Sequence, residues 1–217
     1  RELLAQQRRI AGGTYQGDLT SCTPSPCGYE LATLSPVKDN TMYASSGTLS
    51  NGAGEYLFVG RVNTSGVKRA LLQFDLAGSI PANATITNAK LQLEASLISG
   101  GTTNVTVNKV LAQWGEGTSD ATGDESTGAA ATTNDATWTH RLYPGTTWTT
   151  SGGQYNATAS ATTAVTGTGT YLWTSAAIIS ASVGSRPITR GSPSSTYCCR
   201  SGWPTIVIAT KGSRSWS

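Results

Sequence analysis

Carboxylate side chains are concentrated in one Gly-rich stretch, residues 115–135 (GEGTSDATGDESTGAAATTND). Its oxygen-bearing residues include Glu116, Asp120, Asp124, Glu125, Asn134 and Asp135. Ca²⁺ binds carboxylate and backbone carbonyl oxygens, so Glu116, Asp120 and Asp124 are candidate ligands of a structural calcium ion, although their spacing is not that of an EF-hand. The stretch has no apolar periodicity and is predicted to be a long loop. The alternative to calcium is that its carboxylates are simply solvated.

Aromatic residues that could stack on sugar rings are crowded into the second half of the chain. Trp and Tyr offer flat apolar faces to a sugar and polar edges to its hydroxyl groups. The candidate ligand-binding residues are Trp138, His140, Arg141, Tyr143 and Trp148. Arg141 is suited to pair with the carboxylate of a uronic acid. Trp148 lies in PGTTWTT and is expected to be exposed, whereas Trp114 and Trp173 lie in strand-like runs and are predicted to be core residues. The alternative for Tyr143 and Trp148 is packing beneath long loops.

The sequence does not supply the groups of a recognisable catalytic site. His140 is the only histidine, and no G-x-S-x-G motif is present for a Ser-His-Asp hydrolase. The two carboxyl groups of a glycoside hydrolase flank the scissile bond, but most of the candidate carboxylates share the single loop 115–135. We therefore expect a non-catalytic protein without a cofactor, with a polysaccharide hydrolase or lyase as the remaining alternative.

The four cysteines form two tight pairs in the sequence, Cys22/Cys27 and Cys198/Cys199. An even count in a Ser/Thr-rich chain predicts disulfides and an oxidising compartment, hence an extracellular or cell-surface protein. Three pairings are open. Zinc is not expected, because neither the cysteine spacing nor the single histidine completes a Cys/His site.

Two further features agree with secretion. The chain begins at Arg1 and its only methionine is Met42, so we expect a processed protein whose signal peptide has been removed. Four Asn-x-Ser/Thr sequons are potential glycosylation sites, although a chain so rich in Ser and Thr contains some by chance. These sequons begin at Asn63, Asn83, Asn104 and Asn156.

The composition of the 217-residue chain excludes several protein classes. Only 12% of its residues are charged, against roughly 25% in globular proteins. It contains 34 Thr, 25 Ser and 25 Gly, which do not build the charged helices of a bundle or coiled coil. No apolar run is long enough to predict a membrane-spanning helix. Residues 136–217 carry six basic residues and no acid, but without a Lys/Arg run they do not predict nucleic-acid binding.

The sequence predicts an N-terminal arm, residues 1–38, followed by a β domain. Residues 1–13 predict a short helix ended by a Gly pair, and residues 14–38 predict a Cys/Pro-rich loop. Short strands separated by Gly-containing turns follow, with alternation clearest in 84–97, which we expect to form a hairpin with 103–111. Further strands are predicted near 55–61, 67–76, 137–142, 170–174 and 204–210, and one or two helical turns in 174–183. This pattern is typical of an all-β sandwich or jelly roll.

Several ordered segments resemble a known family. They are DNTMYASSGTLSNGAGEYLFVGR (39–61), RALLQFDLAGSIPANATITNAKLQLEAS (69–96), VNKVLAQWGEGTSD (107–120) and ATWTHRLYPGTTW (136–148). Together they resemble the DNRLRE-type domain, which is related to archaeal disaggregatase and to carbohydrate-binding module family 96. The resemblance covers about 39–174 and a final strand near 204–210, whereas 181–203 is atypical. It implies an antiparallel β-sandwich of jelly-roll type over 39–217, with 1–38 as an extension.

The function expected on these grounds is a non-catalytic extracellular module that binds polysaccharide, another glycan or matrix material. The alternative is a structural subunit of an extracellular filament or surface layer. In that case the polar tails would be ordered by neighbouring copies of the chain through strand addition.

Overall fold

The computed structural model describes residues 2–6, 18–20, 29–62, 66–80, 85–86, 88–178 and 205–210. Within them the chain is all-β, as predicted, and its sheets are antiparallel. The strands are β1 (Glu2–Gln6), β2 (Asp18–Thr20), β3 (Tyr29–Leu31), β4 (Pro36–Tyr43), β5 (Leu49–Ser50), β6 (Tyr56–Val62), β7 (Gly66–Phe74), β8 (Thr85–Ile86), β9 (Lys90–Ala95), β10 (Leu97–Ile98), β11 (Thr103–Lys109), β12 (Ala129–Ala130), β13 (His140–Leu142), β14 (Thr146–Thr147), β15 (Ala161–Val165), β16 (Gly169–Thr174) and β17 (Thr205–Thr210). Residues 176–178 form a helical turn inside the predicted segment 174–183.

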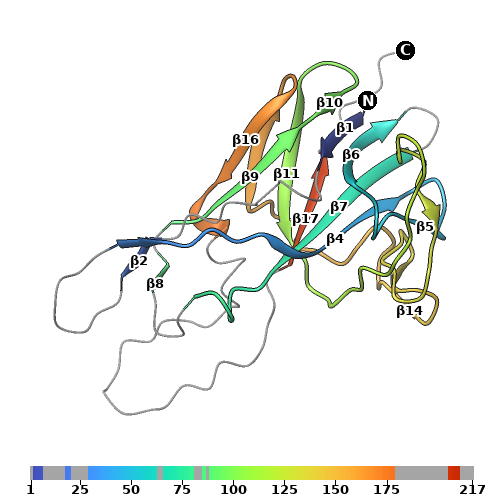
Figure 1. Ribbon diagram of the computed structural model, residues 1–217, viewed down its shortest axis with the longest axis horizontal. Coiled ribbons are helices and arrows are strands. Elements are labelled where there is room, and N and C mark those ends of the chain that lie inside the picture. Colours follow the sequence, from blue (N-terminus) through green and yellow to red (C-terminus); the bar gives the residue numbers. More distant parts are fainter. Residues whose placement is uncertain are drawn as a thin grey trace, which may run out of the picture.

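One large sheet organises the fold (Figure 1). Its strands follow the order β10-β1-β6-β7-β17-β11-β15, and β4 also pairs with β7. The sequence of β7, GVKRALLQF, is apolar in its second half, where both faces are buried. Strands covered on both faces read as continuous apolar runs rather than alternating ones. β7 is therefore the central strand of the large sheet, and it pairs with β4, β6 and β17.

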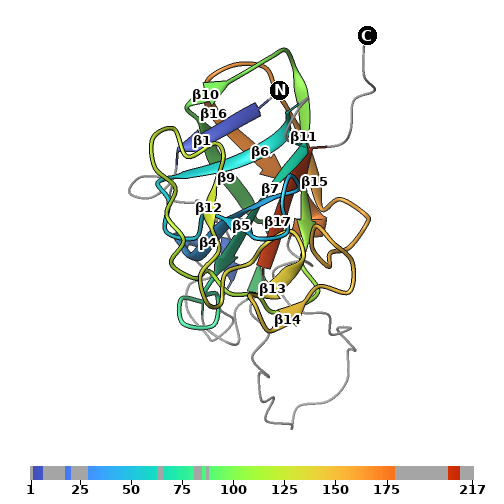
Figure 2. The same cartoon turned by 90° about the vertical axis from the view of Figure 1, so that its right-hand side faces the viewer.

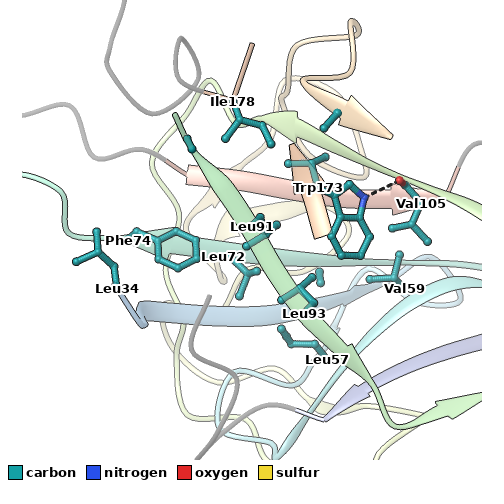
Figure 3. Packing of buried hydrophobic residues seen from close by; sticks show 14 of the residues in the cluster. Leu34, Leu57, Val59, Leu72, Phe74, Leu91, Leu93, Val105, Trp173 and Ile178 are labelled. Carbon is teal, nitrogen blue, oxygen red and sulfur yellow. Dashed lines mark hydrogen bonds between the residues drawn. The ribbon is translucent and has the colours of Figure 1, made fainter. Parts of the chain in front are cut away.

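A small sheet of β9 and β16 covers one face of the large sheet (Figure 3). Leu91 and Leu93 of β9 pack with Leu72 and Val105 of the large sheet in one hydrophobic core. Trp173 of β16 is buried in the same core, as predicted, and its Nε1 donates a hydrogen bond to the carbonyl oxygen of Val105 at 2.8 Å. Two sheets packed through their apolar faces form a sandwich; jelly-roll connectivity stays a prediction.

Loops between β11 and β15 cover the opposite face of β4 and β7. Met42 and Leu71 of these strands form a second core with Val110, Trp114 and Trp148. Trp114 is buried, as predicted. The short strands β12, β13 and β14 lie within these loops; β13 pairs with β14, and β12 pairs with β5. Figure 2 shows these short strands on the side of the molecule that faces the viewer. The cover carries the candidate ligand-binding residues.

Two local predictions are wrong. The hairpin between 84–97 and 103–111 does not form, because β9 pairs with β16 in the small sheet whereas β11 pairs with β15 and β17 in the large one.

The predicted helix at the N-terminus is a strand over Glu2–Gln6, antiparallel to β6 and β10. Pairing with distant strands outweighs a local helix propensity of a few tenths of a kcal/mol per residue. The predicted N-terminal arm, 1–38, therefore contributes β1 to the large sheet.

The predictions for the cysteines and for segment 181–203 concern residues that the structure does not describe. Cys22, Cys27, Cys198 and Cys199 and the atypical segment 181–203 lie outside the described residues. In the described part, no helix has the length and apolarity needed to cross a membrane.

Candidate functional site

The hairpin of β13 and β14 brings His140 and Tyr143 together. Their rings meet edge to face with centroids 5.1 Å apart, and both side chains are half-buried. The His140 Nδ1 lies 2.8 Å from the Thr139 Oγ1 and 3.3 Å from the Thr137 Oγ1. The main-chain N–H of His140 also donates to Thr137 Oγ1 at 2.9 Å. The two threonines thus fix the imidazole, and the imidazole fixes the phenol ring.

Trp138 lies against a cation of the large sheet. The Arg69 guanidinium carbon is 4.8 Å from the Trp138 ring centroid and 5.0 Å from that of Tyr155. Its Nη1 donates to the carbonyl oxygen of Gly152, and burial lowers the pKa of the guanidinium even though Tyr155 acts in the opposite direction. Arg69 Nε is buried without a hydrogen-bond partner in the described part of the chain. Trp138 is half-buried, with one ring face occupied by Arg69.

The close packing around Arg69 depends on a glycine. Gly152 has a φ of +88°, in the left-handed region that favours glycine. A Cβ at this position would lie 2.6 Å from Arg69 Nη1 and 2.7 Å from the Trp138 ring. The signal for Arg69 in the sequence is a Lys-Arg pair inside the apolar run 67–76, because a cation in a buried strand requires partners.

Trp148 is a core residue, and the prediction that it is exposed is wrong. Its side chain is 5% exposed and belongs to the second hydrophobic core. The Trp148 Nε1 donates to the carbonyl oxygen of Thr137 at 2.9 Å, and its main-chain N–H donates to Thr139 at 3.0 Å. The tryptophan therefore holds the hairpin from below instead of offering its ring to a ligand.

Arg141 ties the hairpin to the neighbouring loop. Its Nη1 donates to the carbonyl oxygen of Gln113 at 3.0 Å, and its own carbonyl oxygen accepts from the Gly115 N–H at 3.0 Å. The Arg141 side chain is half-buried. Of the five predicted ligand-binding residues, His140 and Tyr143 are in direct ring contact, and Trp138 and Arg141 lie on the same segment.

The acidic loop 115–135 is anchored by Glu125, an oxygen-bearing residue of the loop that was not among the predicted calcium ligands. The Glu125 side chain is 5% exposed. Its carboxylate accepts hydrogen bonds at 2.9 Å from the Asn51 Nδ2 and from the main-chain N–H groups of Glu55 and Tyr56. Its carbonyl oxygen accepts from the Tyr43 hydroxyl at 3.1 Å. The loop is therefore fixed to the ends of β4 and β6.

Two other acids of the loop region are also structural. The Glu116 Oε1 accepts from the Asp39 N–H at 2.8 Å, and the Glu116 carbonyl oxygen accepts from Asn40 Nδ2 at 3.0 Å. Asp135 is fully buried, with its Oδ2 accepting from the Thr132 N–H and hydroxyl. These contacts fix the start of the loop to β4 and hold the turn at its end between Thr132 and Asp135.

The predicted calcium ligands Glu116, Asp120 and Asp124 are not brought together. Asp124 is exposed and accepts from the N–H and hydroxyl of Ser126, which lower the pKa of its carboxyl group. Asp120 is exposed as well. Among the residues that the structure describes, no three His, Cys, Asp or Glu side chains gather as a metal site. The calcium prediction thus has no geometric support in this part of the chain.

Comparison of the chain with protein-family models, with curated proteins and with solved structures found no match in any of the three.

Proposed function

We propose that this chain is a non-catalytic extracellular module that binds polysaccharide through its β13–β14 hairpin. The binding surface, called the hairpin surface, consists of Trp138, His140, Arg141 and Tyr143. The observation that carries the proposal is the edge-to-face pair of His140 and Tyr143, half-exposed and held in place by threonine oxygens. A ring pair that is already ordered loses little entropy when a sugar stacks on it.

The charge of the hairpin favours an acidic polysaccharide. No acidic residue occurs after Asp135, so His140 and Arg141 have no acidic sequence neighbour on the C-terminal side. A guanidinium has five N–H donors, and the one bond from Arg141 to Gln113 leaves others for a ligand carboxylate. Uronic-acid polymers therefore fit the hairpin surface better than neutral ones.

The roles of the acidic residues support the absence of catalysis. Glu116, Glu125 and Asp135 each accept hydrogen bonds from main-chain N–H groups and hold loops in place. A glycoside hydrolase needs two carboxyl groups facing a shared substrate. These three carboxylates instead accept hydrogen bonds from the main chain of the protein itself.

Binding to polymers of defined charge tests the proposal. Affinity electrophoresis of the chain through gels containing polygalacturonate or neutral dextran is expected to show retardation by the polyuronate. Tyr143→Ala and His140→Ala are each expected to weaken retardation about tenfold, equivalent to about 1.4 kcal/mol. Leu172→Ala is the control, because Leu172 is exposed on β16 of the small sheet. Equal retardation of all variants, or none by any acidic polymer, would overturn the proposal.

One observation favours the second candidate function, a structural subunit of a filament or surface layer. β1 lies between β6 and β10, and its residues Glu2–Gln6 pair with Tyr56–Gly60 of β6. Copies of the chain can polymerise through such a strand, because β1 of one copy can pair with β6 and β10 of the next copy. Light scattering and electron microscopy at rising protein concentration test this. Polymers that disappear when residues 1–17 are deleted would support it, and a monomer throughout would refute it.

A further inference from the structure

Two of the four sequons lie in very different surroundings. In Asn156-Ala157-Thr158 all three residues are exposed, on the loop that follows the bridge between Val110 and Tyr155. In Asn104-Val105-Thr106 only the asparagine is exposed. Asn63 and Asn83 lie outside the described residues. The sequons at Asn156 and Asn104 therefore form a matched pair with the same chemistry and different accessibility.

The loop holds the backbone of Asn156 and its side-chain oxygen through hydrogen bonds. The Asn156 N–H donates to the Lys109 carbonyl oxygen at 2.8 Å, and its carbonyl oxygen accepts from Asn108 Nδ2 at 2.9 Å. Its Oδ1 accepts from the Thr158 N–H at 3.1 Å, which closes an Asx-turn. Within the described part of the chain, the Asn156 Nδ2 makes no hydrogen bond. The amide nitrogen is presented to solvent beside the threonine of its own sequon.

Asn104 is held in the interior of a sheet. It pairs with Ala164 of β15, and Val105 and Thr106 pair with both β15 and β17. Val105 is fully buried and Thr106 is 9% exposed. An enzyme that must grasp the whole tripeptide would have to break both ladders of β11 to reach this sequon.

We propose that Asn156 is an acceptor site for N-linked glycosylation and that Asn104 in the folded chain is not. The donor is an oligosaccharide linked to a lipid pyrophosphate, and an oligosaccharyltransferase carries out the transfer. A bond forms between Asn156 Nδ2 and C1 of the first sugar while the bond from C1 to the pyrophosphate oxygen breaks. The amide loses one proton, the lipid pyrophosphate leaves, and nothing is oxidised or reduced. The proposal shares only the extracellular location with the polysaccharide-binding function.

The first test is modification during secretion. The full chain is produced behind a secretion leader in a eukaryotic host and treated with peptide N-glycosidase in heavy-oxygen water, which leaves a labelled aspartate at each occupied site. Mass spectrometry is expected to find the label at position 156. Asn156→Gln and Thr158→Ala are expected to remove it, and Thr158→Ser, which keeps the hydroxyl, to retain it. An unlabelled Asn156 in the secreted chain would overturn the proposal.

The second test separates folded-state accessibility from modification during synthesis. Folded chain from a host that does not glycosylate it is incubated with purified oligosaccharyltransferase and lipid-linked oligosaccharide. Asn156 is expected to be modified at least ten times faster than Asn104, and Asn104→Gln to leave the product unchanged. Equal modification of the two sites, or modification of Asn104 alone, would refute the proposal. Because polysaccharide binding is measured on unmodified chain, failure of one proposal is distinguishable from failure of the other.

Discussion

The Arg69 guanidinium carbon lies 4.8 Å from the centre of the Trp138 ring, so a cation of the central strand β7 packs against the segment that carries the hairpin surface. Its neighbour Lys68 is held in a similar way. The Lys68 Nζ lies 5.6 Å from the Tyr43 ring centroid and 5.1 Å from that of Phe58, and it donates to the Ser126 carbonyl oxygen. Two consecutive cations thus each hold part of the loop cover on the sheet through aromatic and carbonyl contacts.

Arg69→Lys is expected to lower the free energy of unfolding by about 2 kcal/mol. A lysine ammonium cannot lie flat against both rings and also donate to Gly152. Urea denaturation followed by tryptophan fluorescence measures the change. Arg61→Lys is the control on β6, where the side chain is exposed, and is expected to stay within about 0.5 kcal/mol of the parent chain. Equal effects of the two substitutions would contradict the packing role of Arg69.

Glu125→Ala is expected to destabilise the chain by about 3 kcal/mol, because it leaves the N–H donors of Asn51, Glu55 and Tyr56 without their acceptor. Glu125→Gln keeps one acceptor oxygen and is expected to cost less. Asp120→Ala, at an exposed position of the same loop, is the control and is expected to be nearly neutral. Chemical denaturation of the three variants checks the order, and a neutral Glu125→Ala would show that the loop is not held by this carboxylate.

Gly117→Ala and Gly123→Ala separate backbone strain from collision. Both glycines have a left-handed φ, +68° and +72°. A Cβ on Gly123 meets nothing within 4 Å, so only the strain of roughly 1–2 kcal/mol applies. A Cβ on Gly117 would lie 1.9 Å from Asp135 Oδ1, and a substantially larger loss is expected. Thermal unfolding of the two variants measures the difference, and equal melting temperatures would contradict the close approach of Gly117 to Asp135.

The sequence predicted the positions of the strands better than it predicted which strands pair with each other. The alternation in Lys90–Ala95 correctly marks a strand with Leu91 and Leu93 on its buried face. It does not show that this strand lies in the small sheet rather than beside β11, since both arrangements bury the same residues. Residues Glu2–Gln6 were predicted as part of a helix because helix propensity depends on neighbouring residues. Their strand partners in β6 are fifty or more residues away in the sequence. Pairings at that distance depend on the whole fold.

For the candidate site, the structure tests only the packing of the predicted residues, and it changes the interpretation of Trp148. Trp148 was expected to be exposed because its neighbours are polar, yet hydrogen bonds from its N–H groups to Thr137 and Thr139 show that it holds the hairpin. The burial of Glu125 was not predicted, although the residue was counted among the oxygen-bearing residues of the loop, since nothing local distinguishes a buried acid from a solvated one in a Gly-rich loop. The Lys68–Arg69 pair did carry a signal, because two cations in an apolar strand need partners.

Trp148→Ala is expected to destabilise the chain by about 3–5 kcal/mol, as for other buried tryptophans. Tyr143→Ala is expected to cost about 1 kcal/mol or less, because Tyr143 is half-buried at the surface. Urea denaturation and near-ultraviolet circular dichroism measure both effects. If Trp148→Ala keeps full stability and loses only ligand binding, Trp148 is a contact residue and not a core residue.

Tyr171 is expected to ionise at lower pH than an ordinary tyrosine. The Thr166 hydroxyl lies 3.3 Å from the phenol oxygen, and the N–H groups of Thr166 and Gly167 donate to it at 3.1 and 3.0 Å. These contacts favour the phenolate and lower the pKa of Tyr171. The ultraviolet titration of the chain minus that of Tyr171→Phe isolates this group. A difference curve with its midpoint at or above the ordinary tyrosine value would contradict the arrangement.

Binding of the folded chain to polyuronate, compared between the parent, Tyr143→Ala and Leu172→Ala, tests the central claim most directly. The structure has the ordered pair of His140 and Tyr143 on the hairpin and Leu172 on the small sheet. The predicted result is an affinity about tenfold weaker for Tyr143→Ala and unchanged for Leu172→Ala, with both variants folded by circular dichroism. Unchanged affinity of a folded Tyr143→Ala variant would contradict the proposal that the hairpin surface binds polysaccharide.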